Sequence, residues 1–170
     1  MKAQEMGFNL KINTVLVGGC NDDEILDFVD FSAKNQIEVR FLEIMRIGQM
    51  VDKQRTTFVS AADALRKIEE KFTVTPIVMQ EPDSTSFNVM TEEGANIGFI
   101  APESKPLCGN CSRWRLTADG FLRACLMSEK GIKLKDLAAD EIERKLLSVL
   151  VMKPIKKISE INQNMHQIGG

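Results

Sequence analysis

The chain has 170 residues, 44% of them hydrophobic, which is enough to bury the core of one compact domain. Its formal charge of −2 gives no basis for a nucleic-acid or membrane surface, and no apolar run approaches the ~18 residues of a membrane-spanning helix. Four cysteines, three of them clustered, do not form the pattern of a disulfide framework, so we expect a reducing, cytoplasmic setting.

A strand, a helix and a second strand are predicted near the start of the chain. Polar and apolar residues alternate over 9–17, which indicates a strand. Asn21 is placed to cap a helix that ends near Asn35, with Glu24 at the spacing of a capping box. Residues 38–44 predict the second strand. The unit is therefore of the βαβ type with parallel strands, and ligands in such sheets gather at the carboxyl ends of the strands.

Mixed helices and strands are predicted for the rest of the chain. In order, these are a polar loop over 48–57, a helix over 60–71, a strand over 72–79, a hairpin of strands 86–91 and 97–100, and a helix over 140–151. Residues 162–170 predict a flexible tail, because so few apolar groups cannot offset the entropy of ordering it. The fold class is α/β followed by an α+β region.

Three cysteines carry the strongest functional signal. Cys108 and Cys111 have C-x₂-C spacing, so both sulfurs can bind one metal centre. Asp119-Gly120 predicts a hairpin turn that brings Cys125 back toward them. From spacing alone, the metal is either structural zinc, with Cys20 or His166 as fourth ligand, or iron in a cluster.

Two arginines accompany the cysteines. Arg113 and Arg115 alternate along the predicted strand and so share one face, where two guanidiniums suit a polyphosphate. Trp114 points the opposite way, which favours the core. The alternative is that both arginines are solvated surface charges.

The cysteine segment resembles the C-terminal cluster motif of the GTP 3′,8-cyclase family, which are radical S-adenosylmethionine enzymes of molybdenum cofactor biosynthesis. The resemblance rests on Cys108-x₂-Cys111-x-Arg113-x-Arg115-Leu116-Thr117-Ala118-Asp119-Gly120, followed by Leu122-Arg123-x-Cys125-Leu126. Three other segments are similar to the family in the same order: residues 11–24, residues 39–45 and the terminal Ile168-Gly169-Gly170.

The resemblance implies a fold and a division of the chain. Residues 1–50 would supply the last strands of an incomplete, TIM-like α/β barrel. Residues 51–170 would form the closing α+β region with the cluster-binding hairpin, ending in the tail over 162–170. The C-x₃-C-x₂-C spacing of the family's N-terminal half does not occur here, so the chain resembles the C-terminal half and is expected to be inactive alone.

The resemblance also implies cofactors, substrates and residue roles. Three cysteines would hold a 4Fe–4S cluster with one iron open to GTP, while S-adenosylmethionine and a second 4Fe–4S cluster belong to the other half. The residues with implied roles are Cys108, Cys111 and Cys125 for the cluster, Lys11, Arg40, Arg113, Trp114 and Arg115 for GTP, Met45 for S-adenosylmethionine, and Gly169 and Gly170 for catalysis.

The partners expected are GTP, S-adenosylmethionine and the N-terminal radical half; a homodimer is allowed, and neither nucleic acid nor membrane is expected. The competing hypothesis is a non-catalytic zinc or iron–sulfur binding module. Without the resemblance, Lys11 and Arg40 would be taken as strand-surface charges and Met45 as core packing.

Overall fold

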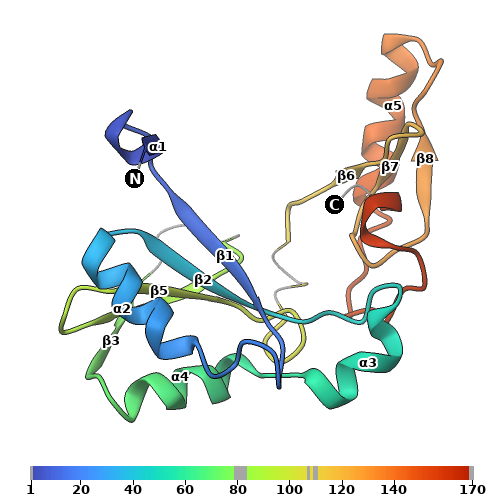
Figure 1. Cartoon of the computed structure of the whole chain (residues 1–170). Helices are drawn as coiled ribbons and strands as arrows, with labels where there is room; N and C mark the ends of the chain where they lie inside the picture. The colour runs from blue at the N-terminus through green and yellow to red at the C-terminus, as the bar shows by residue number, and fades with distance from the viewer. Residues whose placement is uncertain (1, 79–83, 107, 109–110, 169–170) are drawn as a thin grey trace. The chain divides into compact units, whose positions relative to one another are not determined.

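The computed structural model describes residues 2–78, 84–106, 108 and 111–168, and it divides into two compact units (Figure 1). The first unit comprises Met1–Ile44 and Arg55–Pro106, and the second comprises Met45–Gln54 and Leu107–Gly170. Both mix helices and strands, which confirms the α/β class.

The first unit is built on a five-stranded mixed sheet. In spatial order its strands are β1 (Lys11–Leu16), β2 (Glu38–Glu43), β5 (Asn96–Ile100), β4 (Phe87–Thr91) and β3 (Val74–Ile77). β1, β2 and β5 are parallel neighbours, whereas β4 and β3 run antiparallel. The βαβ unit and the hairpin are therefore confirmed. The described strands form no closed barrel, so the half-barrel interpretation is not confirmed.

Two helices, α2 (Ile25–Asn35) and α4 (Ala61–Glu69), cover one face of this sheet, and the short helix α1 (Lys2–Glu5) precedes β1 (Figure 1). Alternate side chains of each strand face these helices and form the core, with Phe41 and Phe99 at its centre. The helix-free face carries polar residues of β1, β2, β4 and β5 together with some apolar ones.

The second unit contains a three-stranded antiparallel sheet of β6 (Arg115–Leu116), β7 (Phe121–Arg123) and β8 (Gly131–Lys133). Gly120 adopts φ +86° in the β6–β7 turn, a conformation that glycine reaches without strain. The predicted hairpin turn is thus confirmed. Helix α5 (Ala139–Leu150) packs on this sheet through Val149, which is fully buried with Leu122 and Ala124.

The C-terminal segment packs against residues 45–48 of the same unit. Ile161 forms a bridge with Ile47, and Arg46 makes an ion pair with Glu160 at 2.5 Å. The segment then enters the 3₁₀ helix η2 (Met165–Gln167). Ile168 is fully buried, so the expectation that residues 163–170 pack poorly is wrong at this position. Gly169 and Gly170 lie outside the described residues.

Two local predictions are corrected by the structure. The expected loop over 48–57 contains the helix α3 (Met50–Thr57), which escaped detection because Gln54 is its one buried residue. Asn21 does not cap α2; its amide instead accepts from Val17 N–H and donates to the Val15 carbonyl, so it stabilises the turn after β1. Among the described residues, no helix has the length and apolar content that crossing a bilayer requires.

Candidate functional site

The three clustered cysteines are all half-buried thiols in the second unit. Burial raises the pKa of Cys108, and electrostatic repulsion from Cys125 and Cys111 raises it further. Lys157 and Arg113 oppose the shift by favouring the thiolate.

Cys111 has the opposite balance. Burial acts to raise its pKa, but hydrogen bonds from the backbone and side chain of Arg113, with the charges of Arg113 and Lys153, lower it overall. A thiol with a lowered pKa forms the thiolate that binds metal more readily. Arg113 therefore interacts directly with the Cys111 thiol, which the pattern of alternating arginines did not predict.

Cys125 follows β7, and its sulfur accepts a hydrogen bond from the Met127 N–H at 3.4 Å. The hairpin returns the chain as expected, since β6 and β7 pair with Arg115 opposite Arg123. However, the described residues contain no group of three or more His, Cys, Asp or Glu side chains placed to hold a metal ion. Metal binding by the three cysteines therefore stays a prediction, although the donor set itself suits iron or zinc.

The arginines flanking the cysteines do not occupy equivalent positions. The strand begins only at Arg115, so strand geometry does not place Arg113 on the same face. Arg113 is exposed and Arg115 is half-buried. Trp114 packs against the core formed with Leu122, which agrees with the packing alternative. Roles for Arg113, Trp114 and Arg115 in binding GTP stay predictions.

Lys11 and Arg40 lie next to each other on the helix-free face of the first unit's sheet, joined by Glu38. The Glu38 carboxylate accepts from Arg40 Nε at 2.6 Å and pairs with Lys11 Nζ at 3.0 Å. Burial would raise the Glu38 pKa, but hydrogen bonds from Arg40, Asn88 and Lys11 outweigh it and lower that pKa. Two cations thus flank one carboxylate, leaving a net positive charge at this place.

Sequence reasoning missed two residues of this polar face. Asn88 is 6% exposed and donates to Glu38 at 3.0 Å and to Asn96 at 2.9 Å. Gly98 stands between Arg40 and Asn88 in the strand register, and a Cβ there would lie 3.0 Å from Arg40 Cγ. The missing side chain is what lets these neighbours meet over β5. In the part of the chain that the structure describes, nothing donates to Asn88 Oδ1, so a buried acceptor remains beside the cations.

Met45 lies in the second unit and packs against the cluster of Ile47, Met127, Ile161 and Ile168, as Cys125 also does. This packing fits the core alternative for Met45, and its contact with S-adenosylmethionine stays a prediction. The structure nevertheless brings Met45, Cys125 and the residue before Gly169-Gly170 to one hydrophobic cluster. That proximity could not be derived from the sequence, because the three positions are up to 123 residues apart.

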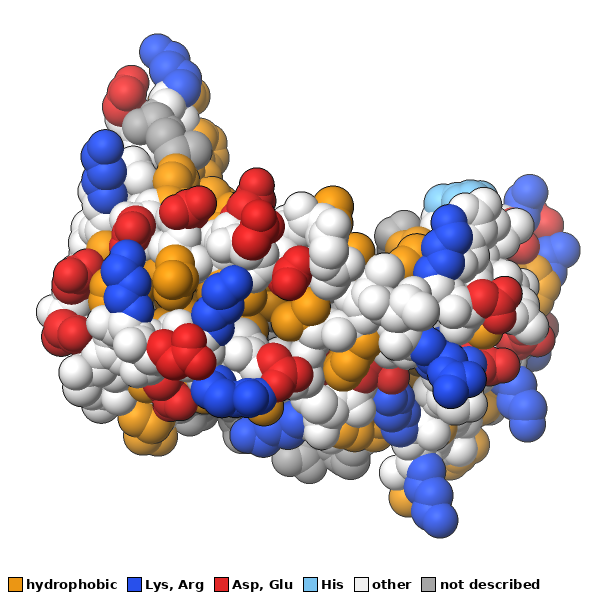
Figure 2. All heavy atoms as spheres, turned by 60° about the horizontal axis from the view of Figure 1, so that its bottom comes forward, with side chains coloured by type: hydrophobic (Ala, Val, Ile, Leu, Met, Phe, Trp, Pro, Cys, Tyr) orange, Lys and Arg blue, Asp and Glu red, His pale blue; other side chains and the backbone are white. Residues whose placement is uncertain are grey.

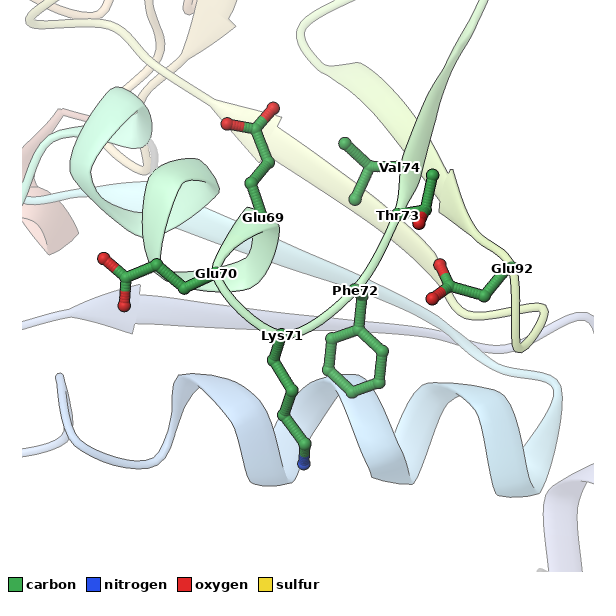
Figure 3. A pocket seen from close by; sticks show the side chains of 7 residues that line it. All are labelled: Glu69, Glu70, Lys71, Phe72, Thr73, Val74 and Glu92. Atoms are coloured by element: carbon green, nitrogen blue, oxygen red, sulfur yellow. The ribbon is translucent and has the colours of Figure 1, made fainter.

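A separate depression of about 430 Å³ lies where α4 leads into β3 (Figure 3). Its labelled side chains include three carboxylates, Glu69, Glu70 and Glu92, around the buried Phe72. Lys71 forms an ion pair with Asp30, with 3.6 Å between Nζ and Oδ2. An acidic rim repels phosphate groups, and none of the predicted site residues lines this depression.

Charged side chains of both signs are interspersed over the face shown in Figure 2. A broad basic patch of the kind that binds nucleic acid is therefore not seen on that face. Cys20 is exposed in the turn after β1, and His166 is exposed on η2. Neither belongs to a metal-holding group within the described residues.

Several known proteins similar to this chain carry the name GTP 3′,8-cyclase. The chain is 45% identical over 168 residues to the GTP 3′,8-cyclase of Synechocystis sp., covering 99% of this chain and 51% of that protein. It is 39% identical over 141 residues to the GTP 3′,8-cyclase of Aquifex aeolicus, covering 83% and 44%. The enzyme of the same name from Syntrophomonas wolfei is 34% identical over 183 residues.

The chain thus spans about half the length of the curated relatives it matches, which is consistent with a C-terminal half. The family model described as Molybdenum Cofactor Synthesis C matches residues 37–163, which include β2, the cysteine segment and α5. The chain belongs to this Molybdenum Cofactor Synthesis C family.

Proposed function

We propose that the chain is the C-terminal, cluster- and GTP-binding part of a GTP 3′,8-cyclase. In that role it contributes to the radical cyclisation of GTP to (8S)-3′,8-cyclo-7,8-dihydroguanosine 5′-triphosphate. The observation that carries the proposal is the 45% identity over 99% of the chain to a protein with this activity. Family membership makes molybdenum cofactor biosynthesis the pathway in question.

The three thiols would hold the cluster. Cys108, Cys111 and Cys125 supply soft donors, and Arg113 lowers the pKa of Cys111, which favours the thiolate form of that residue. A 4Fe–4S cluster with three cysteine ligands offers one open iron to a substrate heteroatom. A reducing cytoplasm would keep the thiols available.

Lys11 and Arg40 would contribute charge to the binding of GTP. A triphosphate carries several negative charges, and guanidinium and ammonium groups are its usual partners. Glu38 occupies only part of their donor capacity: Arg40 gives it Nε, and the terminal nitrogens of a guanidinium can bind a second group. We propose further that the N-terminal radical half, with S-adenosylmethionine and its own cluster, completes the enzyme.

The test uses a chimaera that joins this chain to the N-terminal half of the Synechocystis relative. Arg40→Ala should weaken GTP binding by about tenfold or more, since a hydrogen bond to a charged group contributes about 1.5–3 kcal/mol. Iron content should stay unchanged, because the cysteines belong to the other unit. Titration calorimetry and iron analysis measure the two quantities.

Arg66→Ala is the matched control, because Arg66 is exposed on α4, where it pairs with Asp63 one helical turn away. It should leave GTP affinity unchanged. A chimaera that carries both clusters and still neither binds nor cyclises GTP would contradict the proposed function.

A further inference from the structure

Lys153 lies where the two cysteine-bearing segments meet. Its Nζ donates to the Arg113 carbonyl at 2.7 Å and to the Ala124 carbonyl at 3.0 Å. The same nitrogen lies 3.8 Å from Cys111 Sγ. Arg113 follows Cys111 by two residues, and Ala124 directly precedes Cys125, so a single ammonium group contacts both segments.

Helix α5, not the cysteine loop, determines the position of Lys153. Val149 anchors the end of α5 in the core that also contains Ala124. Lys153 follows in the turn after the helix, where its backbone N–H donates to the Leu150 carbonyl at 3.3 Å. The Lys153 side chain therefore extends from the end of the packed helix α5 toward the segment of Cys111 and Arg113.

A lysine suits this position chemically. Its ammonium has three donors and no acceptor, and here two main-chain carbonyls and one sulfur surround it. Because Lys153 donates to main-chain carbonyls, its hydrogen bonds hold the backbone next to Cys111 and Cys125 in place.

We propose that Lys153 is a positioning residue that holds the segment of Cys111 and Arg113 against the segment of Ala124 and Cys125, and that it donates an N–H to the Cys111 sulfur when metal is bound. The identity of that metal rests on the proposed function. The link between the two segments does not, because it is formed by this chain's own groups.

The first experiment measures the link without metal. With Cys20→Ser and Cys108→Ser in place, only Cys111 and Cys125 can be bridged by dibromobimane, which fluoresces strongly once both arms have reacted. Lys153→Met should slow this bridging by about three- to tenfold, the effect of losing one or two hydrogen bonds, after each rate is divided by that of the one-armed reagent monobromobimane, which corrects for any change in thiol ionisation. Lys156→Met, a change of the same kind at an exposed position, should leave the rate unchanged.

Conservative replacement separates positioning from general loss of structure. Lys153→Arg keeps a charged donor of similar reach and should restore most of the bridging rate. Far-UV circular dichroism checks the fold, and Lys153→Gln replaces Lys153→Met should the latter not fold. If the folded Lys153→Met variant is bridged as fast as the chain that keeps Lys153, the proposal is overturned.

The second experiment uses the four-cysteine chain after anaerobic loading with iron and sulfide. Lys153→Met should release iron to a chelator about three- to tenfold faster than Lys156→Met does. Equal release rates would overturn the proposed link to the bound metal. A parent chain that takes up no iron would instead refute the proposed function, while the bridging experiment would still decide the role of Lys153.

Discussion

At the scale of single residues, Glu38 shows how a sheet holds two cations side by side. Lys11 and Arg40 come from adjacent parallel strands, and one carboxylate between them offsets their mutual repulsion. Asn88 holds that carboxylate from a third strand. The two ion pairs with Glu38 therefore orient the side chains of Lys11 and Arg40.

This arrangement predicts a dependence of stability on pH. The Glu38 pKa is lowered in the folded state, so its stabilising contribution is fully present above the ordinary carboxyl pKa and is lost as the pH falls through the lowered value. Glu38→Gln should therefore lose less free energy of unfolding between pH 7 and acid than the parent chain does. Urea denaturation at several pH values measures this.

Glu92→Gln, at an exposed position, should keep the acid dependence of the parent chain. An acid dependence for Glu38→Gln equal to that of the parent would show that Glu38 carries no such contribution.

Sequence reasoning at this scale found residues whose signal is local or typical of a family. The C-x₂-C pair and Asp119-Gly120 are short patterns with direct physical meaning. Asn88, Gly98 and Lys153 could not be found this way, because their partners lie far along the chain: Asn88 reaches Glu38 across 50 residues and Lys153 reaches Arg113 across 40. Only the folded chain brings such groups together.

At the scale of elements, a helix could be predicted from the sequence where its capping residue and its apolar stripe agree. The helix predicted over 60–71 is present as α4, and Ser60 caps it by accepting the Asp63 N–H with its hydroxyl. The helix also has a clear apolar stripe of Ala61, Ala64 and Ile68. By contrast, α3 buries only Gln54 and has no apolar stripe, so periodicity could not reveal it.

The C-terminal element carries a second prediction. Ile168 is fully buried against Ile47, Met127 and Ile161, although its polar neighbours suggested a loose tail. Ile168→Ala should lower the free energy of unfolding by about 2–5 kcal/mol, the usual loss for a buried large aliphatic side chain. Urea denaturation of the whole chain, followed by the fluorescence of Trp114 in the second unit, measures this loss.

Ile155→Ala is the matched control, because Ile155 is 93% exposed and should change stability by no more than about 0.5 kcal/mol. Equal stability of the Ile168→Ala variant and the parent chain would mean that the tail does not stay docked in solution.

At the scale of the whole molecule, the candidate site residues are divided between two compact units. Lys11 and Arg40 belong to the first, while the cysteines, Arg113 and Met45 belong to the second. Joint binding of GTP by Lys11, Arg40, Arg113 and Arg115 beside the cysteines would require both units, and it stays a prediction. The half-barrel is not confirmed, because the described strands form a five-stranded mixed sheet and a separate three-stranded sheet.

The central claim is that three cysteines of this chain bind an iron–sulfur cluster. The most direct test is anaerobic reconstitution followed by iron, sulfide and zinc analysis and by absorption spectroscopy. We expect a brown protein that absorbs near roughly 400 nm and holds about four irons per chain. Cys125→Ser should lose most of that iron, whereas Cys20→Ser, at an exposed position, should retain it. A colourless chain with one zinc, or iron uptake unaffected by Cys125→Ser, would contradict the account.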